Sequence, residues 1–276
     1  MMNSKILSAI FVAALLVSCS SDDSDNPPAP NTNYFPLSTG NYWTYQNQRE
    51  VEGETPTQNT ETLSVEDVEE VNGEKQYDME SDQPTNGGVA TTIFANGRLS
   101  KNQGKLKYNG KLDFYVGQSG IDTISFPVNN AIVFDSNAGI NAQLFSFSDS
   151  FQQEIPVDNL TIPVTINYTV RTKNLGIINS RTVNGVEYEN VLSSEVVMEL
   201  SVVAEIVTPF GQIDVDIMTP QEVMIATNYF AEGVGMVESD VSIHYEFEDL
   251  TEYGFPNVPP VDIQSTQEID SYVVEE

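Results

Sequence analysis

Cysteine is nearly absent from this chain, with Cys19 as the single one among 276 residues. If that thiol is used as an anchor, the rest of the chain contains no disulfide, zinc–thiolate site or cysteine nucleophile. Histidine is equally scarce, and His244 stands in a polar stretch beside Ser242 and Glu246. The sequence also has no GxSxG turn, which an α/β-hydrolase needs around its nucleophile. We therefore expect His244 to be a surface residue, and we expect no catalytic residue of the nucleophile–histidine type.

Basic residues are few, with 11 Lys and Arg against 41 Asp and Glu. The segment 182–276 has none. Five of them gather in one short stretch: Arg98, Lys101, Lys105, Lys107 and Lys111. Phosphate backbones are bound by basic surfaces, so this composition excludes nucleic acid as a partner. The acidity also favours solubility and repels anionic lipid headgroups from most of the surface.

Motifs for metals and cofactors are absent as well. The sequence has no HExxH motif, no EF-hand loop, and no Walker or dinucleotide-binding glycine motif, so no cofactor is expected. Asp214 and Asp216 are spaced to share one face of a strand and are candidates for Ca²⁺ binding, with plain solvation as the alternative. A glycoside hydrolase needs only two carboxylates at a suitable separation, and sequence cannot place two acids in space.

One apolar run stands out, at residues 6–17. It is too short for a transmembrane helix, which needs about 20 residues. Lys5 precedes it and small residues follow, which is the pattern of a secretory signal peptide. The end of the run, LVSC at 16–19, resembles the lipobox of bacterial lipoproteins. This resemblance implies that residues 1–18 are removed and that Cys19 carries two or three acyl chains, which suffice for stable membrane anchoring.

Residues 19–33 continue from this cysteine into a polar segment that is rich in proline and aspartate. Such a stretch cannot bury enough surface to fold, and it forms an extended, disordered linker. Its acidic beginning resembles the export signal that follows the lipidated cysteine in surface lipoproteins of Bacteroidota. The resemblance implies an outer-membrane lipoprotein whose predicted membrane contact is the lipid on Cys19. We expect it on the cell surface, with the periplasmic leaflet as the alternative.

Residues 34–276 are expected to form a single β-rich domain, because alternation of apolar and polar residues dominates them. The even positions are apolar at 162–170 and at 196–206, as are most odd positions at 237–247. This period is typical of half-buried antiparallel strands, and no helical period extends beyond about two turns. The predicted fold is all-β and mainly antiparallel, as a curved sheet, half-barrel or barrel with few short helices.

Asn-Gly pairs, which favour the type I′ turn of a β-hairpin, begin at 72, 86, 96, 109 and 184. Apolar or β-branched residues flank three of them closely. We therefore predict hairpins near 72, 109 and 184.

Two blocks, YFPL with the following G…YW.Y at 34–45 and YFAEGVGMV at 229–237, resemble uncharacterised lipoproteins of Bacteroidota. The resemblance implies a β-rich fold, and one form of it is a half-barrel like those of the lipocalin-like or lipoprotein-carrier-like groups. It implies no established activity. Trp43, with Tyr42 and Tyr45 beside it, is interpreted as a core residue. A role in stacking on a sugar or another ligand is the alternative for these three aromatic residues.

These observations favour a non-catalytic module of the cell envelope that binds or assembles with a polysaccharide, a lipid or a protein. Three hypotheses for the function predict different structures. A carrier encloses an apolar pocket, a structural module has a filled core and uses its outer face, and a carboxylate-dependent glycan hydrolase has two acids in a cleft. The last is the enzymatic alternative.

Overall fold

The computed structural model describes residues 33–275, apart from 116–122, 158–159, 209–210 and 252–257. These residues belong to one compact unit that spans Asn31–Glu276. The predicted signal peptide, Cys19 and nearly all of the predicted linker lie outside the described residues. In the part of the chain that the structure covers, no helix has the length and hydropathy needed to cross a membrane.

The described part of the chain is almost entirely β-structure, which confirms the predicted all-β class and the absence of long helices. Its elements, in chain order, are β1 (Tyr42–Val51), β2 (Thr57–Val71), β3 (Glu74–Ser81), α1 (Val89–Ala95), β4 (Gly97–Asn102), β5 (Lys105–Tyr115), β6 (Thr123–Asp135), β7 (Gln143–Val157), β8 (Leu160–Val183), β9 (Val186–Thr208), β10 (Gly211–Ala231), β11 (Gly235–Tyr245) and β12 (Val261–Val273).

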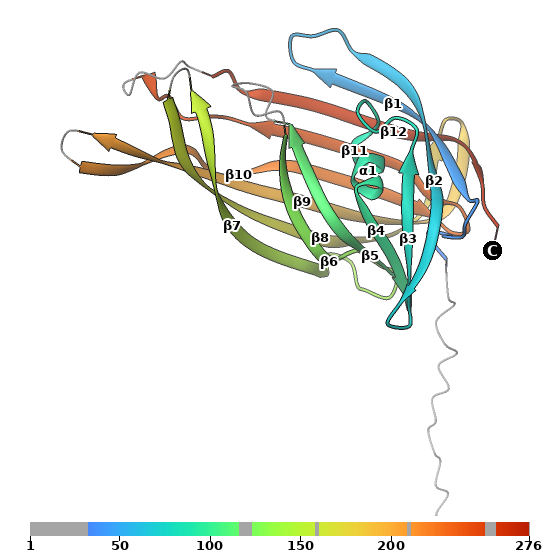
Figure 1. Cartoon of the computed structure of the whole chain (residues 1–276). Coiled ribbons are helices and arrows are strands. Elements are labelled where there is room, and N and C mark those ends of the chain that lie inside the picture. Colours follow the sequence, from blue (N-terminus) through green and yellow to red (C-terminus); the bar gives the residue numbers. More distant parts are fainter. Residues whose placement is uncertain (1–32, 116–122, 158–159, 209–210, 252–257, 276) are drawn as a thin grey trace, which may run out of the picture. The chain divides into compact units, whose positions relative to one another are not determined.

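All twelve of these strands form one antiparallel sheet in the order β6-β5-β4-β3-β2-β1-β12-β11-β10-β9-β8-β7. Strands that are consecutive in the chain pair with each other, except β6 and β7, and the first and last strands, β1 and β12, also pair. The two ends of the sheet are therefore β6 and β7, which are consecutive in the chain. The sheet curls around α1 until β6 contacts β7, β8 and β9, so that it forms a nearly closed barrel (Figure 1).

At this closure β6 lies against the inner face of β8. The Tyr168 hydroxyl donates to the carbonyl of Pro127 at 2.9 Å, and the Thr172 hydroxyl donates to the carbonyl of Ile132 at 2.6 Å. Phe126 of β6 packs on Tyr168 and on Phe151 of β7, with ring centroids 5.1 and 5.8 Å apart. Side chains of the opposite end of the sheet thus cover the edge of β6 and satisfy two of its carbonyls.

The predicted strand faces are confirmed. From Ile162 to Val170 every even side chain is buried in the barrel, and the even positions 196–206 of β9 are buried or half-buried in the same way. Alternate residues of an antiparallel strand point to opposite faces, so the inner face collects the apolar side chains. The outer face of these strands carries the acidic and hydroxyl residues.

The predicted hairpins at Asn72-Gly73 and Asn184-Gly185 are confirmed. Both pairs have positive φ, at 54° and 82° for the first and 49° and 79° for the second. These values fit the type I′ turn, which requires positive φ at both central residues. The turns connect β2 to β3 and β8 to β9.

The predicted hairpin near Asn109-Gly110 is wrong, because this pair lies inside β5. The chain turns instead at Gln103-Gly104, with φ of 49° and 80°. Gly110 pairs with Gly97 of β4, and the ring of Tyr108 lies over both of them. A Cβ on Gly110 would approach the Tyr108 hydroxyl oxygen to 2.4 Å. The glycine is therefore explained by packing under an aromatic ring rather than by a turn.

The β8–β9 hairpin extends beyond β10 and packs against β11 and β12. Arg181 forms ion pairs with Glu238 and Asp240, and its guanidinium carbon lies 3.6 Å from the ring centroid of Tyr229. The Asn184 side chain donates to the carbonyl of Ile269 at 2.9 Å. These contacts fasten the tip of the longest hairpin in the described part of the chain.

Candidate functional site

A belt of polar side chains crosses the inside of the barrel. Its members are cross-strand partners on seven consecutive strands of the sheet and are buried or half-buried: Asn59, Asn47, Gln267, Ser239, Asn228, Ser194 and Asn174. Gln267 donates to the Asn47 side-chain oxygen at 3.0 Å, and Ser239 donates to the Asn228 side-chain oxygen at 2.8 Å. Buried polar groups are stabilising only when they are hydrogen-bonded, and most of this belt meets that condition.

Glu61 lies next to the belt and is fully buried. Its carboxylate accepts hydrogen bonds from the side chains of Asn47 at 2.8 Å, Ser81 at 2.5 Å and Thr91 at 2.7 Å. It also accepts one from the backbone N–H of Gly88 at 2.7 Å. Among the described residues, no lysine or arginine lies within ion-pair distance of Glu61. Hydrogen bonds, rather than a counter-charge, therefore stabilise this carboxylate.

These contacts hold α1 inside the barrel. Gln267 accepts hydrogen bonds from the backbone N–H groups of Ala90 at 2.9 Å and Thr91 at 3.3 Å. The first N–H groups of a helix have no partner within it, and α1 has no side-chain cap of its own. Glu61 of β2 and Gln267 of β12 satisfy them instead.

Glycine makes this approach of α1 to the strands sterically allowed. A Cβ on Gly88 would lie 1.8 Å from the Gln267 side chain, and one on Gly87 would lie 2.3 Å from a Glu61 carboxylate oxygen. No larger residue fits at either position without displacing the two side chains that cap the helix. The Gly87-Gly88 pair is thus part of the attachment of α1.

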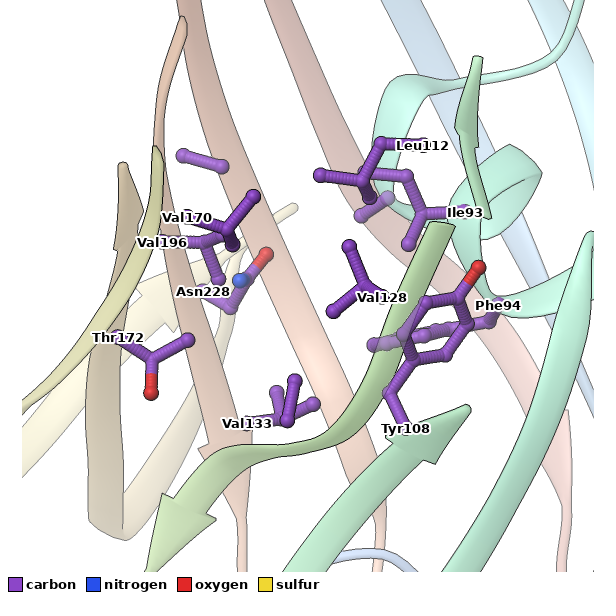
Figure 2. Close-up of a pocket in the computed structure, with 13 residues that line it drawn as sticks. Ile93, Phe94, Tyr108, Leu112, Val128, Val133, Val170, Thr172, Val196 and Asn228 are labelled. Atoms are coloured by element: carbon purple, nitrogen blue, oxygen red, sulfur yellow. The ribbon is translucent and has the colours of Figure 1, made fainter. Parts of the chain in front are cut away.

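The space between α1 and the far side of the barrel is almost filled. A cavity of about 40 Å³ lies there, lined by side chains of α1, β5, β6 and β8–β10. Figure 2 shows Ile93 and Phe94 of α1 on one side and Val170 and Val196 on the other, with Asn228 of the belt at its border. Pockets that bind small ligands usually measure about 300–1,000 Å³. This cavity is large enough for one or a few water molecules.

The two buried carboxylates of the described residues, Glu61 and Glu238, have separate partners. Glu61 lies beside the hydroxyl of Tyr45. Burial raises the pKa of this hydroxyl well above its usual value, and the charge of Glu61 raises the pKa further. Glu238, the other buried carboxylate of the described residues, is bound by Arg181. A glycoside hydrolase needs two carboxylates on either side of an open cleft. Glu61 and Glu238 have separate partners and lie in different parts of the sheet.

The aromatic residues singled out from the sequence lie on two faces of β1. Trp43 and Tyr45 are fully buried, while the side chain of Tyr42 is 38% exposed. The Trp43 indole N–H donates to the carbonyl of Val234 at 2.6 Å, and the Tyr45 hydroxyl donates to that of Met236 at 3.0 Å. A ring that stacks on a soluble ligand needs an accessible face. Of these three residues, only Tyr42 has one. Ligand binding by these residues stays a prediction.

The two blocks of the sequence resemblance meet in space. Phe35 packs on Trp43 and on Phe230, with ring centroids 4.8 and 6.0 Å apart. The backbone N–H of Gly233 donates to the carbonyl of Asn33 at 2.8 Å. Together they close the end of the barrel at which β10 turns into β11 and β1 begins.

The remaining candidates lie on the surface. Asp214 and Asp216 are exposed on β10, with Val215 buried between them, and the described residues contain no cluster of three His, Cys, Asp or Glu that could hold a metal ion. The side chain of His244 is half exposed, 3.4 Å from Asp262 and 3.6 Å from Glu246. It is the expected surface histidine.

A polar hollow of about 220 Å³ lies beside the β4–β5 turn. The Lys101 ammonium there donates to the Asn33 side-chain oxygen at 2.9 Å and to the carbonyl of Phe35 at 3.0 Å. Desolvation by burial lowers the pKa of Lys101. Lys105 at its rim pairs with Asp135. Lys101 thus fastens the first described residues to the barrel.

The chain has no match among protein-family models and none among curated proteins. Two solved structures are similar to it. One is a protein from Parabacteroides distasonis ATCC 8503, provisionally described as a lipoprotein, with a TM-score of 0.35, 11% identity, and coverage of 88% of this chain and 99% of that one. The other is a protein from Bacteroides fragilis NCTC 9343, provisionally described as exported with a YmcC-like fold, with a TM-score of 0.33, 9% identity, and coverage of 87% and 98%. Both scores are too low to define a shared fold.

Proposed function

We propose that this protein is a lipid-anchored lipoprotein of the bacterial cell envelope that acts without catalysis, by binding a partner on its outer surface. The observation that supports this proposal is the filled interior of the barrel. Of the three hypotheses considered from the sequence, it favours the module with a filled core over the carrier and over the glycan hydrolase.

The support for a filled interior comes from both α1 and the aromatic end. The helix contributes Ile93 and Phe94 to the centre of the barrel and leaves a cavity of about 40 Å³. Trp43 and Phe35 close one end. An acyl chain or a sugar would have to displace α1 and break its hydrogen bonds to Glu61 and Gln267. Each such loss of a buried partner costs about 1–3 kcal/mol.

The anchor is proposed from the sequence. The lipobox-like segment 16–19 places the lipid on Cys19, and the Asp-rich start of the linker favours the cell surface of a Bacteroidota bacterium. Asn33, the first described residue, is bound at the aromatic end of the barrel by Gly233 and Lys101. A linker that joins the domain there leaves the outer faces of the sheet available to partners.

Mass spectrometry of the protein purified in mild detergent from its own envelope tests both parts of the proposal. Under denaturing conditions we expect a chain that begins at Cys19 and carries two or three acyl chains. Under native conditions we expect the same mass, because the barrel holds no cargo. A Cys19→Ala variant should lose the acyl mass and leave the membrane fraction.

Two results would contradict the proposal. Additional mass that is present under native conditions and lost on denaturation would show a bound ligand and favour a carrier. An unmodified Cys19 in the membrane-bound protein would refute the lipid anchor.

A further inference from the structure

The strand β7 leaves one long edge of the sheet without a partner strand. It stands at the end of the strand order and pairs with β8 alone. The pairing is unbroken from Phe145 to Ile155. In an antiparallel pair, alternate residues direct their N–H and C=O groups away from the partner. The outer edge of β7, which has no neighbouring strand in the sheet (Figure 1), therefore presents backbone donors and acceptors that no strand pairs, although the N–H of Ser150 already donates to the Asp149 carboxylate at 2.8 Å.

The two edges of the sheet differ in how they are protected. Tyr168 and Thr172 bind carbonyls of the β6 edge, and that edge also contains Pro127. The segment 143–155 of β7 has no proline, lysine or arginine. Natural sheets use these residues, bulges and inward-pointing charges to prevent other chains from pairing with a free edge. Of these features, β7 has the single inward charge of Asp149 and a register irregularity between Gln143 and Phe145, but no proline and no basic residue along 143–155.

The side chains on the inner side of β7 form a row that β6 covers at one point, where Phe126 packs on Phe151. Phe145, Phe147 and Phe151 are half-buried, and the rings of Phe147 and Phe151 pack on Tyr168 of β8. Asp149 lies among them and is exposed. Its carboxylate accepts a hydrogen bond from the backbone N–H of Ser150 at 2.8 Å, and no cation lies within ion-pair distance of it among the described residues. At every second residue the row therefore has two apolar side chains, Phe145 and Phe147, then the acidic Asp149, and then the apolar Phe151.

We propose that the β7 edge binds an extended segment of a partner protein, which adds to the sheet as a further strand. Free backbone groups at strand spacing are complementary to another extended polypeptide. The inner row matches a segment with apolar residues at alternate positions and one lysine or arginine opposite Asp149. This inference rests on the proposed surface-binding function and names its partner class.

A second copy of the chain fits the edge less well. Without the predicted signal peptide, which contains Lys5, the chain has 10 basic and 41 acidic residues and therefore a formal net charge of −31. Two such domains joined edge to edge repel each other, and Asp149 and Glu154 of each β7 would meet like charges. A basic segment of another protein meets attraction at the same positions.

Site-specific photo-crosslinking in the bacterium that makes the protein tests the inference. Ser148→benzoylphenylalanine places the crosslinker on the exposed outer side of β7. Asn167→benzoylphenylalanine is the matched control, because Asn167 is exposed on the same face of β8, whose backbone is paired on both sides. We expect a discrete protein adduct at Ser148 and none at Asn167.

The variant Asp149→Lys shows whether the adduct depends on strand addition. It places a lysine on the edge and reverses the charge that the partner meets, so the Ser148 adduct should fall by about tenfold. Asp149 is exposed, and an unchanged thermal unfolding curve confirms that the fold persists.

Three outcomes would overturn the inference: no adduct at Ser148, an equal adduct at Asn167, or an adduct with the mass of two copies of this chain. Bound cargo in the native mass spectrum would refute the filled-barrel function and leave a Ser148 adduct standing, so the two failures are distinguishable.

Discussion

Replacing Glu61 with alanine is expected to lower the free energy of unfolding by about 4 kcal/mol or more, because each buried donor that loses its acceptor costs about 1–3 kcal/mol. Asn47, Ser81, Thr91 and the backbone of Gly88 would all lose the acceptor that they share, although Asn47 keeps Asn59 and Thr91 keeps the carbonyl of Gly88 as second acceptors. All four residues are buried. Urea-induced unfolding measures the difference.

Two variants serve as controls for this result. Glu61→Gln keeps the shape and one acceptor oxygen, but turns an amide group toward donors, so a smaller loss is expected. Glu70→Ala removes an exposed carboxylate from the same strand and should change the free energy of unfolding by less than about 0.5 kcal/mol. If Glu61→Ala unfolds at the same urea concentration as Glu70→Ala, the carboxylate does not hold α1 in the barrel.

Gly235→Ala is expected to destabilise the protein by about 3 kcal/mol, through backbone strain and overpacking together. Gly235 has a φ of 121°, which disfavours any residue with a Cβ. A Cβ there would lie 2.7 Å from the Trp43 indole nitrogen and 2.8 Å from the Phe35 ring. The Trp43 hydrogen bond to Val234 would have to shift as well.

Gly233→Ala is the matched control for Gly235→Ala. Gly233 also has a positive φ, 71°, but nothing lies within 4 Å of the position of its Cβ. Only the strain cost of about 1 kcal/mol is therefore expected there. Trp43 is the only tryptophan of the chain, so intrinsic fluorescence reports on this cluster during unfolding. Equal losses for the two variants would contradict tight packing of Gly235 on Trp43 and Phe35.

Strand faces were predictable because the physical cause is local. Alternate residues must point to opposite faces, so the apolar positions of β8, β9 and β11 identify their inner sides. The same rule identifies the polar belt in retrospect. Glu61 shares its parity with Leu63 and Val65, and Gln267 shares its parity with Ile269. A polar residue at an inward position is therefore the sequence signal for the attachment of α1, and it was missed.

The closure of the sheet was not predictable, because it depends on contacts between distant segments. Turn residues predict that neighbouring strands pair, but not that β1 pairs with β12 or that the opening lies between β6 and β7. The Asn109-Gly110 pair shows the limit of local rules, since glycine there allows Tyr108 to pack across two strands. The Gly87-Gly88 pair likewise reflects close approach to Glu61 and Gln267, which no local pattern indicates.

The central claim is that α1 is a permanent part of the barrel core rather than a lid over a ligand site. Hydrogen–deuterium exchange of the segment 90–96 tests it most directly. The backbone N–H groups of Ala90, Thr92 and Asn96 are bound by Gln267, Gly88 and the helix itself, so we expect them to be protected as long as those of β5 and β8. Exchange of this segment within seconds, while the strands stay protected, would show that the helix leaves the barrel and would contradict the account.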